Sequence, residues 1–268
     1  MGRHHVFRVR LVDPIGHGAS GTVWRAWDVR LHRYVAAKVV PDDQEVVLRA
    51  PVHPHVLTPF ATVHQDSTHY ALMHLVRGGT ADGLLAEHGA LPAPYVAVLL
   101  RQLLQALGAV HAAGFAHRDV KPANLLLEPT RTGRPHVYLS DLGVAARLSR
   151  RPATAVGTPG YVAPELRPGD PPDPRHDLYA AGVTAAELLT GRIPRHVREV
   201  PSNPLRALLM ALLDPDPERR PATADLAERR LRSVGVPEGA PWRAERCPPD
   251  VRDRLPRPTV LRRLRGPR

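Results

Sequence analysis

The chain has little of several things that mark particular classes of protein. Its 268 residues include one cysteine, Cys247, and only 4% aromatic residues. A single cysteine excludes an internal disulfide, which is compatible with a reducing cytosol. No apolar run approaches the ~18 to 20 residues of a membrane span, and residues 1–10 lack the apolar stretch of a signal peptide. We therefore expect a cytoplasmic protein without a transmembrane segment.

Lysine is also scarce, whereas arginine, alanine and proline are abundant, as expected from the codon bias of a GC-rich genome. The formal net charge of +11 is then weak evidence for an acidic partner. Because no nucleic-acid-binding signature with interleaved aromatic residues is present, we expect no nucleic-acid partner. The 43% hydrophobic content is enough for a core, either in one large domain or in two lobes that share a cleft.

The hydrophobic pattern changes about a quarter of the way along the chain. Up to Val76 it predicts short strands separated by Gly, Pro and Asp, at residues Val9–Val12, Thr22–Trp27, Tyr34–Val40, Val56–Val63 and Tyr70–Leu75. After Gly78-Gly79 it becomes helical, with helices predicted around Leu84 and over Tyr95–Ala112, Asp177–Thr190, Pro204–Leu213 and Thr223–Val234. The part before Gly78 is therefore predicted to be mostly β and the part after Gly79 mostly α.

A glycine-rich motif lies between the first two predicted strands. Residues 16–23 read G-H-G-A-S-G-T-V, a G-x-G-x-x-G-x-V pattern whose glycines let backbone N–H groups approach phosphates. A plain hairpin turn is the alternative. A dinucleotide fingerprint is disfavoured because a strand follows the loop where a helix would be required. Lys38 follows on the next predicted strand, where it could reach the α- and β-phosphates of a nucleotide or simply face solvent.

Two further motifs carry the strongest signal. Residues 117–124 read H-R-D-V-K-P-A-N, and residues 140–143 read S-D-L-G. With the preceding loop and lysine, they resemble the protein kinase family, specifically the eukaryotic-like serine/threonine kinases of bacteria. The resemblance spans roughly residues 9–231. It implies an α+β, bilobal protein kinase fold, with a small antiparallel β N-lobe containing a shortened helix and a mostly α-helical C-lobe.

The implied activity is transfer of the γ-phosphoryl group of Mg-ATP to a Ser or Thr hydroxyl of a protein, which includes the chain itself. By the family's pattern, Asp119 orients the substrate hydroxyl or accepts its proton, Lys121 contacts the γ-phosphate, Lys38 contacts the other phosphates, and Asn124 and Asp141 hold Mg²⁺. The lysine two residues after Asp119 is typical of the serine/threonine branch.

The resemblance also predicts the ATP-binding residues. Residues 70–76 are expected to form the last N-lobe strand and the linker between the lobes, with Met73 as gatekeeper and with His74 and Arg77 at the hinge. By hydrophobicity alone, core packing explains the apolar members equally well. The full predicted set is Ile15, Gly16, Gly18, Gly21, Val23, Ala36, Lys38, Met73, His74, Val76 and Leu126.

Residues 157–165, G-T-P-G-Y-V-A-P-E, resemble the family's protein-substrate segment. Thr158 is expected near Asp119, and Arg220 is expected to pair with Glu165. Arg118, next to Asp119, resembles the type of kinase in which this arginine binds a phosphate on the activation loop. Thr154, or else Ser149, is the predicted phosphorylation site.

Two segments are shorter than in the family. Only residues 39–52 separate Lys38 from His53-Pro54, so the helix that carries the glutamate partner of Lys38 is expected to be stunted. The register leaves Glu45 and Gln44 as competing candidates. About ten residues connect Pro194 to the predicted helix at Pro204, which affects the region where the family docks substrates.

We expect residues 1–76 to form the N-lobe, 77–236 the C-lobe and 237–268 a basic tail rich in Pro and Arg. The tail is predicted to be disordered, or else to dock on an acidic partner or an anionic surface. A pseudokinase or nucleotide-binding regulatory scaffold stays open as the alternative to an active kinase. Phosphorylation of a small molecule is a third alternative.

Overall fold

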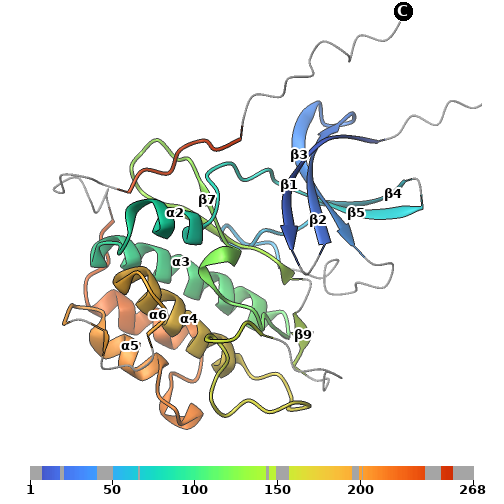
Figure 1. Cartoon of the computed structure of the whole chain (residues 1–268). Helices are drawn as coiled ribbons and strands as arrows, with labels where there is room; N and C mark the ends of the chain where they lie inside the picture. The colour runs from blue at the N-terminus through green and yellow to red at the C-terminus, as the bar shows by residue number, and fades with distance from the viewer. Residues whose placement is uncertain are drawn as a thin grey trace, which may run out of the picture.

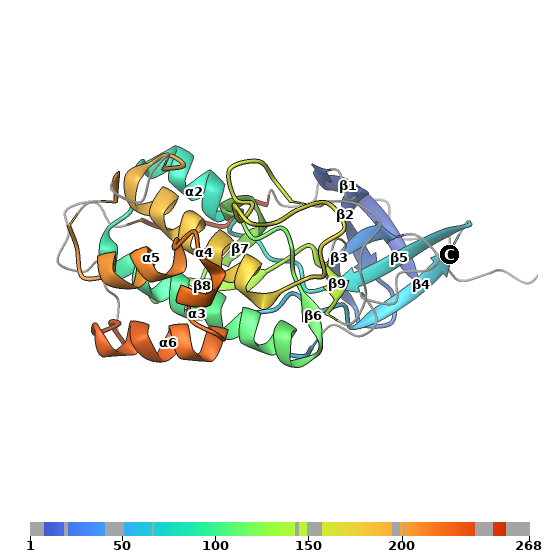
Figure 2. The same cartoon turned by 90° about the horizontal axis from the view of Figure 1, so that it is seen from below.

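The computed structural model describes residues 8–18, 21–40, 51–65, 67–142, 145–148, 157–194, 199–200, 202–238 and 249–255. A β-sheet forms one lobe and helices form most of the other (Figure 1). Viewed from below, the sheet lies at one end of the molecule and the helices at the other (Figure 2). The predicted bilobal α+β class is confirmed. The shortened helix expected within residues 41–50 lies outside the described residues.

The N-lobe sheet is antiparallel, with the strand order β1-β2-β3-β5-β4. Its apolar face packs around buried side chains such as Val9, Val35 and Leu72. The register sets Lys38 of β3 opposite Val23 of β2 and Ala71 of β5, which fixes the lysine in the middle strand. The strands are β1 (Val9–Gly18), β2 (Gly21–Asp28), β3 (Arg33–Val40), β4 (Ala61–Gln65) and β5 (Thr68–Met73).

The strand predicted over Val56–Val63 is wrong in its first half, since β4 begins at Ala61. Pro59 has no backbone N–H to give to a ladder. Val56 instead forms an isolated bridge with Leu139, and the Leu57 N–H donates to the Leu139 carbonyl at 2.9 Å. This segment therefore attaches the N-lobe to the C-lobe core.

The C-lobe is organised around α3 (Ala93–Ala112), whose buried face includes Leu99, Leu103 and Leu107. By length and composition α3 is the one described helix that could span a membrane, and two thirds (67%) of its most apolar stretch is buried inside the protein. The other helices are α2 (Ala81–His88), α4 (Pro174–Thr190), α5 (Arg206–Leu212) and α6 (Ala224–Ser233). Thr223 caps α6 as predicted, because its hydroxyl accepts from the Leu226 N–H at 3.1 Å. The α4 helix begins three residues before Asp177, with Asp173 as its cap.

Short elements between α3 and α4 hold the segments that carry the motifs. Strand β6 (Phe115–Ala116) pairs with β9 (Ala146–Arg147), and β7 (Leu125–Glu128) pairs with β8 (His136–Leu139). A 3₁₀ turn, η1 (Pro122–Asn124), leads into β7. A second 3₁₀ turn, η4 (Pro217–Arg219), precedes Arg220. The 117–124 motif thus lies between β6 and β7, and the 140–143 motif begins where β8 ends.

The prediction of a disordered tail is wrong for residues 249–255, which lie against the hinge and α2 (Figure 1). The Arg254 N–H donates to the Arg77 carbonyl at 2.8 Å. Pro249 is buried, and Val251 packs against the C-lobe core. Proline and arginine show no periodicity, so the sequence pattern gave no sign of this packing. The rest of the tail beyond residue 238 lies outside the described residues.

The predicted pair of Glu165 and Arg220 is present and fixes the 157–165 segment to the helices. Two Arg220 nitrogens donate to the two carboxylate oxygens of Glu165, each at 2.7 Å, and the Arg220 side chain is fully buried. The guanidinium also lies over the Tyr179 ring, 4.9 Å from its centroid. A bidentate pair of this kind gives both orientation and energy.

Arg220→Ala should lower the free energy of unfolding by about 3 kcal/mol, because the Glu165 carboxylate loses its buried partner and a cavity is left in place of the guanidinium. Arg219→Ala is the matched control: its side chain is 74% exposed, so a change within about 0.5 kcal/mol is expected. Urea denaturation of both variants measures the difference. Equal effects at the two positions would contradict a structural role for the Glu165 pair.

Candidate active site

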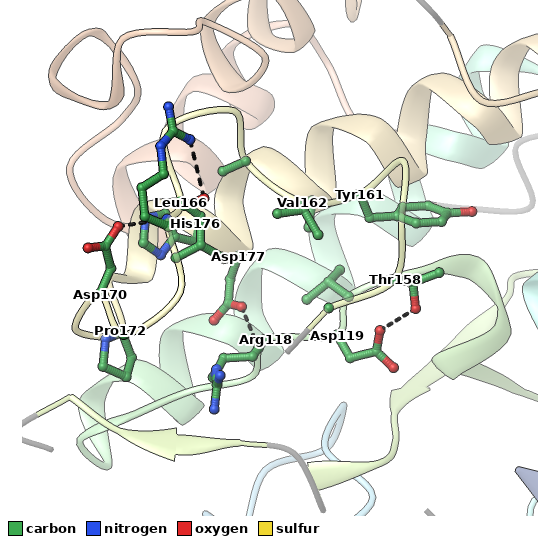
Figure 3. A pocket seen from close by; sticks show the side chains of 16 residues that line it. Arg118, Asp119, Thr158, Tyr161, Val162, Leu166, Asp170, Pro172, His176 and Asp177 are labelled. Carbon is green, nitrogen blue, oxygen red and sulfur yellow. Dashed lines mark hydrogen bonds between the residues drawn. The ribbon is translucent and has the colours of Figure 1, made fainter. Parts of the chain in front are cut away.

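A buried carboxylate, Asp177 of α4, binds the backbone of the loop that carries the 117–124 motif. Its two oxygens accept from the backbone N–H groups of His117 and Arg118, each at 2.8 Å, and one of them lies 2.8 Å from Nε2 of His111. Figure 3 shows Asp177 pointing at Arg118. Arg118 has a left-handed backbone with φ of 70°, which is unfavourable for a residue with a Cβ. Asp177 stabilises that conformation.

Burial would raise the pKa of the Asp177 carboxyl, but the hydrogen bond to His111, the electrostatic effect of His111 and His117 and the backbone hydrogen bond from Arg118 outweigh it, and the pKa is lowered. Asp177 is therefore ionised inside the C-lobe, where its charge is compensated by donors. The His117 ring extends the contact, because its Nε2 lies 2.9 Å from the Ser140 carbonyl oxygen. The two motifs are thus joined beside Asp141.

The predicted catalytic side chains of the 117–124 motif and Thr158 lie together around Asp119. The Thr158 hydroxyl donates to one carboxylate oxygen at 2.6 Å (Figure 3), and Lys121 Nζ lies 2.8 Å from the other. Lys121 also donates to Thr158 Oγ1 at 2.6 Å. The Asn124 amide donates to the Asp119 carbonyl at 2.7 Å and to its carboxylate at 3.0 Å. Four predicted residues therefore form one network.

Burial alone would raise the pKa of Asp119, but the hydrogen bonds from Lys121, Thr158 and Asn124 hold it below its usual value. The carboxylate is therefore ionised at neutral pH. A carboxylate held in this way is a good hydrogen-bond acceptor for a hydroxyl and a weak base.

Lys38 reaches across the space between the lobes and pairs with Asp141, with Nζ 2.6 Å from Oδ1. Both side chains are largely sheltered from solvent. Like Arg118, Asp141 has a left-handed backbone, with φ of 64°. The candidates Glu45 and Gln44 for the partner of Lys38 lie outside the described residues.

The predicted adenine-binding side chains come together as one apolar cluster. Ala36 and Met73 are buried and directly opposite each other in the register of β3 and β5. Ile15, Val23, Val76 and Leu126 pack against them. The position of Leu126 follows from the pairing of β7 with β8, which places it opposite Tyr138.

The described glycines of the glycine-rich motif lie at the adjoining ends of β1 and β2, and Ala19 and Ser20 lie outside the described residues. Gly16 is opposite Val23, and Gly18 is opposite Gly21. Gly21 has φ of 112°, and a Cβ there would lie 3.2 Å from the Val39 carbonyl oxygen. His74, also predicted at the nucleotide, directs its side chain to Glu128, with 3.2 Å between Nε2 and Oε2. The His74 side chain therefore has its polar partner on β7.

A cleft opens beside Asp119, between the 157–167 segment and the start of α4 (Figure 3). Its lining includes Val162, Leu166 and His176. Tyr161, at its edge, donates to Glu187 of α4 at 2.5 Å. No role for Glu187 was predicted from the sequence. The only available signal was a single acidic residue, ten positions after Asp177, on an otherwise apolar helix.

The donor set fits a magnesium ion. Mg²⁺ is bound in proteins by one or two carboxylates or other oxygen ligands, with phosphate and water oxygens in the remaining positions. The Asp141 carboxylate would supply one ligand. The Asn124 amide nitrogen donates to Asp119, so its oxygen would be the end that binds a cation. No group of three His, Cys, Asp or Glu side chains that could hold a metal unaided occurs within the part of the chain that the structure describes.

Comparison with known proteins agrees with this arrangement. A model of the protein kinase domain matches residues 9–231. The chain belongs to the protein kinase family. It is 34% identical over 270 residues to serine/threonine-protein kinase PkaA of Streptomyces coelicolor, covering 84% of this chain and 49% of that protein.

Two mycobacterial relatives are similar to the same extent. Serine/threonine-protein kinase PknL of Mycobacterium tuberculosis is 36% identical, covering 67% of this chain and 48% of that protein. PknB of Mycobacterium leprae is 31% identical, covering 91% and 45%. The chain therefore spans about half the length of the curated relatives it matches.

Thr158→Val should raise the pKa of Asp119, because it removes a 2.6 Å hydrogen bond that favours the ionised carboxylate. Carbon-13 NMR titration of the aspartate carboxyl groups measures the shift. Thr132→Val is the control, since the hydroxyl of Thr132 bonds to Thr130 in an exposed turn away from Asp119. An unchanged Asp119 titration in Thr158→Val would show that the hydroxyl does not contact the carboxylate in solution.

Proposed function

We propose that the chain is a protein serine/threonine kinase, which transfers the γ-phosphoryl group of Mg-ATP to a Ser or Thr hydroxyl of a protein. The observation that carries the proposal is the network in which Lys121, Thr158 and Asn124 all contact Asp119, across from the pair of Lys38 and Asp141. Phosphoryl transfer needs positioning and charge neutralisation more than covalent chemistry, and this network provides both.

In this proposal Asp119 accepts a hydrogen bond from the attacking hydroxyl and takes its proton late in the transfer. The lowered pKa of Asp119 supports a late proton transfer, because a weakly basic carboxylate takes up the proton only near the end of the reaction. Thr158 fixes one oxygen of the carboxylate. Lys121 neutralises charge on the transferred group, while it stays within reach of Asp119.

Lys38 would contact the other phosphates, and Asn124 and Asp141 would hold the magnesium. A bound Mg²⁺ would supply charge neutralisation on the phosphate oxygens. Ile15, Val23, Ala36, Met73, Val76 and Leu126 would enclose the adenine, with the backbone of His74 and with Gly16, Gly18 and Gly21 completing the nucleotide site.

The same geometry supports further proposals about the setting. The cleft beside Asp119 is suited to a peptide segment, and its apolar wall of Val162 and Leu166 favours an apolar side chain next to the acceptor residue. Activity on itself at Thr154 or Ser149 follows from their places between Asp141 and Glu165, although both lie outside the described residues. A cytoplasmic location is proposed because ATP is the phosphoryl donor.

One observation favours the alternative, a nucleotide-binding scaffold without transfer. The Lys38 amine lies 2.6 Å from the carboxylate assigned to the metal. If that ion pair persisted when nucleotide binds, neither group would do its proposed work. An experiment must therefore measure nucleotide binding and phosphate transfer separately.

Asp119→Asn and Asp141→Asn should each remove transfer of labelled phosphate while the thermal unfolding midpoint stays close to that of the wild type. Asp119→Asn loses the proton acceptor, and Asp141→Asn loses a metal ligand. Asp216→Asn is the control, because Asp216 is half-exposed at the start of η4, away from the site. Transfer at the wild-type rate by Asp141→Asn would refute the metal assignment.

Nucleotide binding can be measured independently because the chain has only two lysines, Lys38 and Lys121. An amine-acylating reagent followed by mass spectrometry reports on those two side chains and the α-amino group. Mg-ATP should protect both lysines in the wild type and should still protect Lys38 in Asp119→Asn. Protection without transfer in the wild type would favour the scaffold.

A further inference from the structure

Residues 249–255 cross the hinge and touch both α2 and the cluster around the predicted adenine site. We name this segment the strap. It lies well over a hundred residues along the chain from the hinge residues that it contacts. In Figure 1 it is the red segment that passes beside α2 and runs toward the sheet.

Polar contacts bind the strap to the hinge. The Arg254 N–H donates to the Arg77 carbonyl at 2.8 Å, and Arg254 Nε donates to the Gly78 carbonyl at 3.2 Å. Two ion pairs cross the contact: Arg77 pairs with Asp253 of the strap, and Arg254 of the strap pairs with Glu87 of α2. Each exposed ion pair contributes little alone. Combined with backbone hydrogen bonds, however, the two pairs fix the register of the strap.

Apolar contacts extend the strap on both sides of the hinge. Val251 packs against the C-lobe core, and Leu255 packs against the cluster that contains Ala36 and Met73. The strap approaches closest at Gly78, where a Cβ would lie 2.3 Å from Val251 Cγ1. The same Cβ would lie 2.4 Å from the Leu127 carbonyl oxygen, so glycine at this position accommodates both the strap and β7.

From these contacts we propose that the strap is part of the nucleotide site, as a brace that holds the hinge in the conformation that binds adenine. The inference rests on the proposed function, because it assumes that the Ala36–Met73 cluster receives the adenine. Leu255 lies against the same cluster as Ile15, Val23 and Leu126. Asp253 and Leu255 are thus positioning residues that act through the hinge.

Reversing the charges tests the brace. Asp253→Arg places two arginines together, and Arg77→Asp places two aspartates together, so each variant should loosen the strap. The double variant R77D/D253R restores opposite charges. We expect each single variant to raise the dissociation constant of Mg-ATP about five- to tenfold. The double variant should restore most of the lost affinity. The kcat should change less than about twofold, because the Asp119 network is untouched.

Leu255→Ser removes the apolar contact without adding charge and should weaken Mg-ATP binding in the same way. Arg252→Ala is the matched control, because Arg252 is 73% exposed and pairs with Asp250 of the strap. Affinity is measured by the protection of Lys38 from acylation, which does not require transfer. A strap with a merely structural role would lower the unfolding midpoint and leave the affinity of the folded fraction unchanged.

A second measurement needs no variant. Coupling between two binding events is reciprocal, so saturating Mg-ATP should slow hydrogen exchange at the Arg254 amide of the wild-type chain by a similar factor. Exchange that does not respond to Mg-ATP would overturn the proposal. So would unchanged or tighter Mg-ATP binding in Asp253→Arg and Leu255→Ser.

The outcomes separate the two proposals. A wild-type chain that binds Mg-ATP and transfers no phosphate refutes the proposed activity alone, and the affinities of the variants still decide the role of the strap. A wild-type chain that does not bind Mg-ATP refutes both.

Discussion

A single buried charge, the carboxylate of Asp177, supports the rest of the site. Water-free surroundings disfavour an ionised carboxyl unless donors surround it, and here two backbone N–H groups and His111 do so. Those same bonds hold Arg118 at φ of 70°, a conformation that is unfavourable by about 1–3 kcal/mol for such a residue. The geometry of the following residue, Asp119, depends on this turn. A charge in the helical core thus determines where the Asp119 carboxylate lies.

The constraint extends from one motif to the other through His117, whose ring contacts the carbonyl of Ser140. The next residue, Asp141, is also left-handed and contacts Lys38 from the other lobe. Both lysines of the chain therefore lie at the site, and the chain's other strongly basic side chains are arginines. Arginine and lysine are not equivalent, since an ammonium is a compact charge whereas a guanidinium is a planar fork. Scarcity of lysine was thus a compositional signal for these two positions.

Local patterns predicted most elements, since β1, β2, β3, β5 and the main helices follow from alternation, periodicity and a Thr223 cap. The motifs predicted the members of the Asp119 network, because their spacing is local to one loop. Contacts between distant segments were harder to predict: the pairing of Lys38 with Asp141 joins residues 103 positions apart. The strap was missed because its packing depends on ion pairs and on the space above Gly78, and neither produces a periodic pattern.

The central claim is that Asp177 positions the catalytic loop without touching the substrates. The most direct test is the single-turnover rate of phosphate transfer by Asp177→Asn, measured together with Mg-ATP protection of Lys38. Small displacements of reacting groups reduce rates by about a hundredfold. The account predicts a loss of at least about that size, with protection of Lys38 retained. A wild-type rate in a folded Asp177→Asn protein would contradict it.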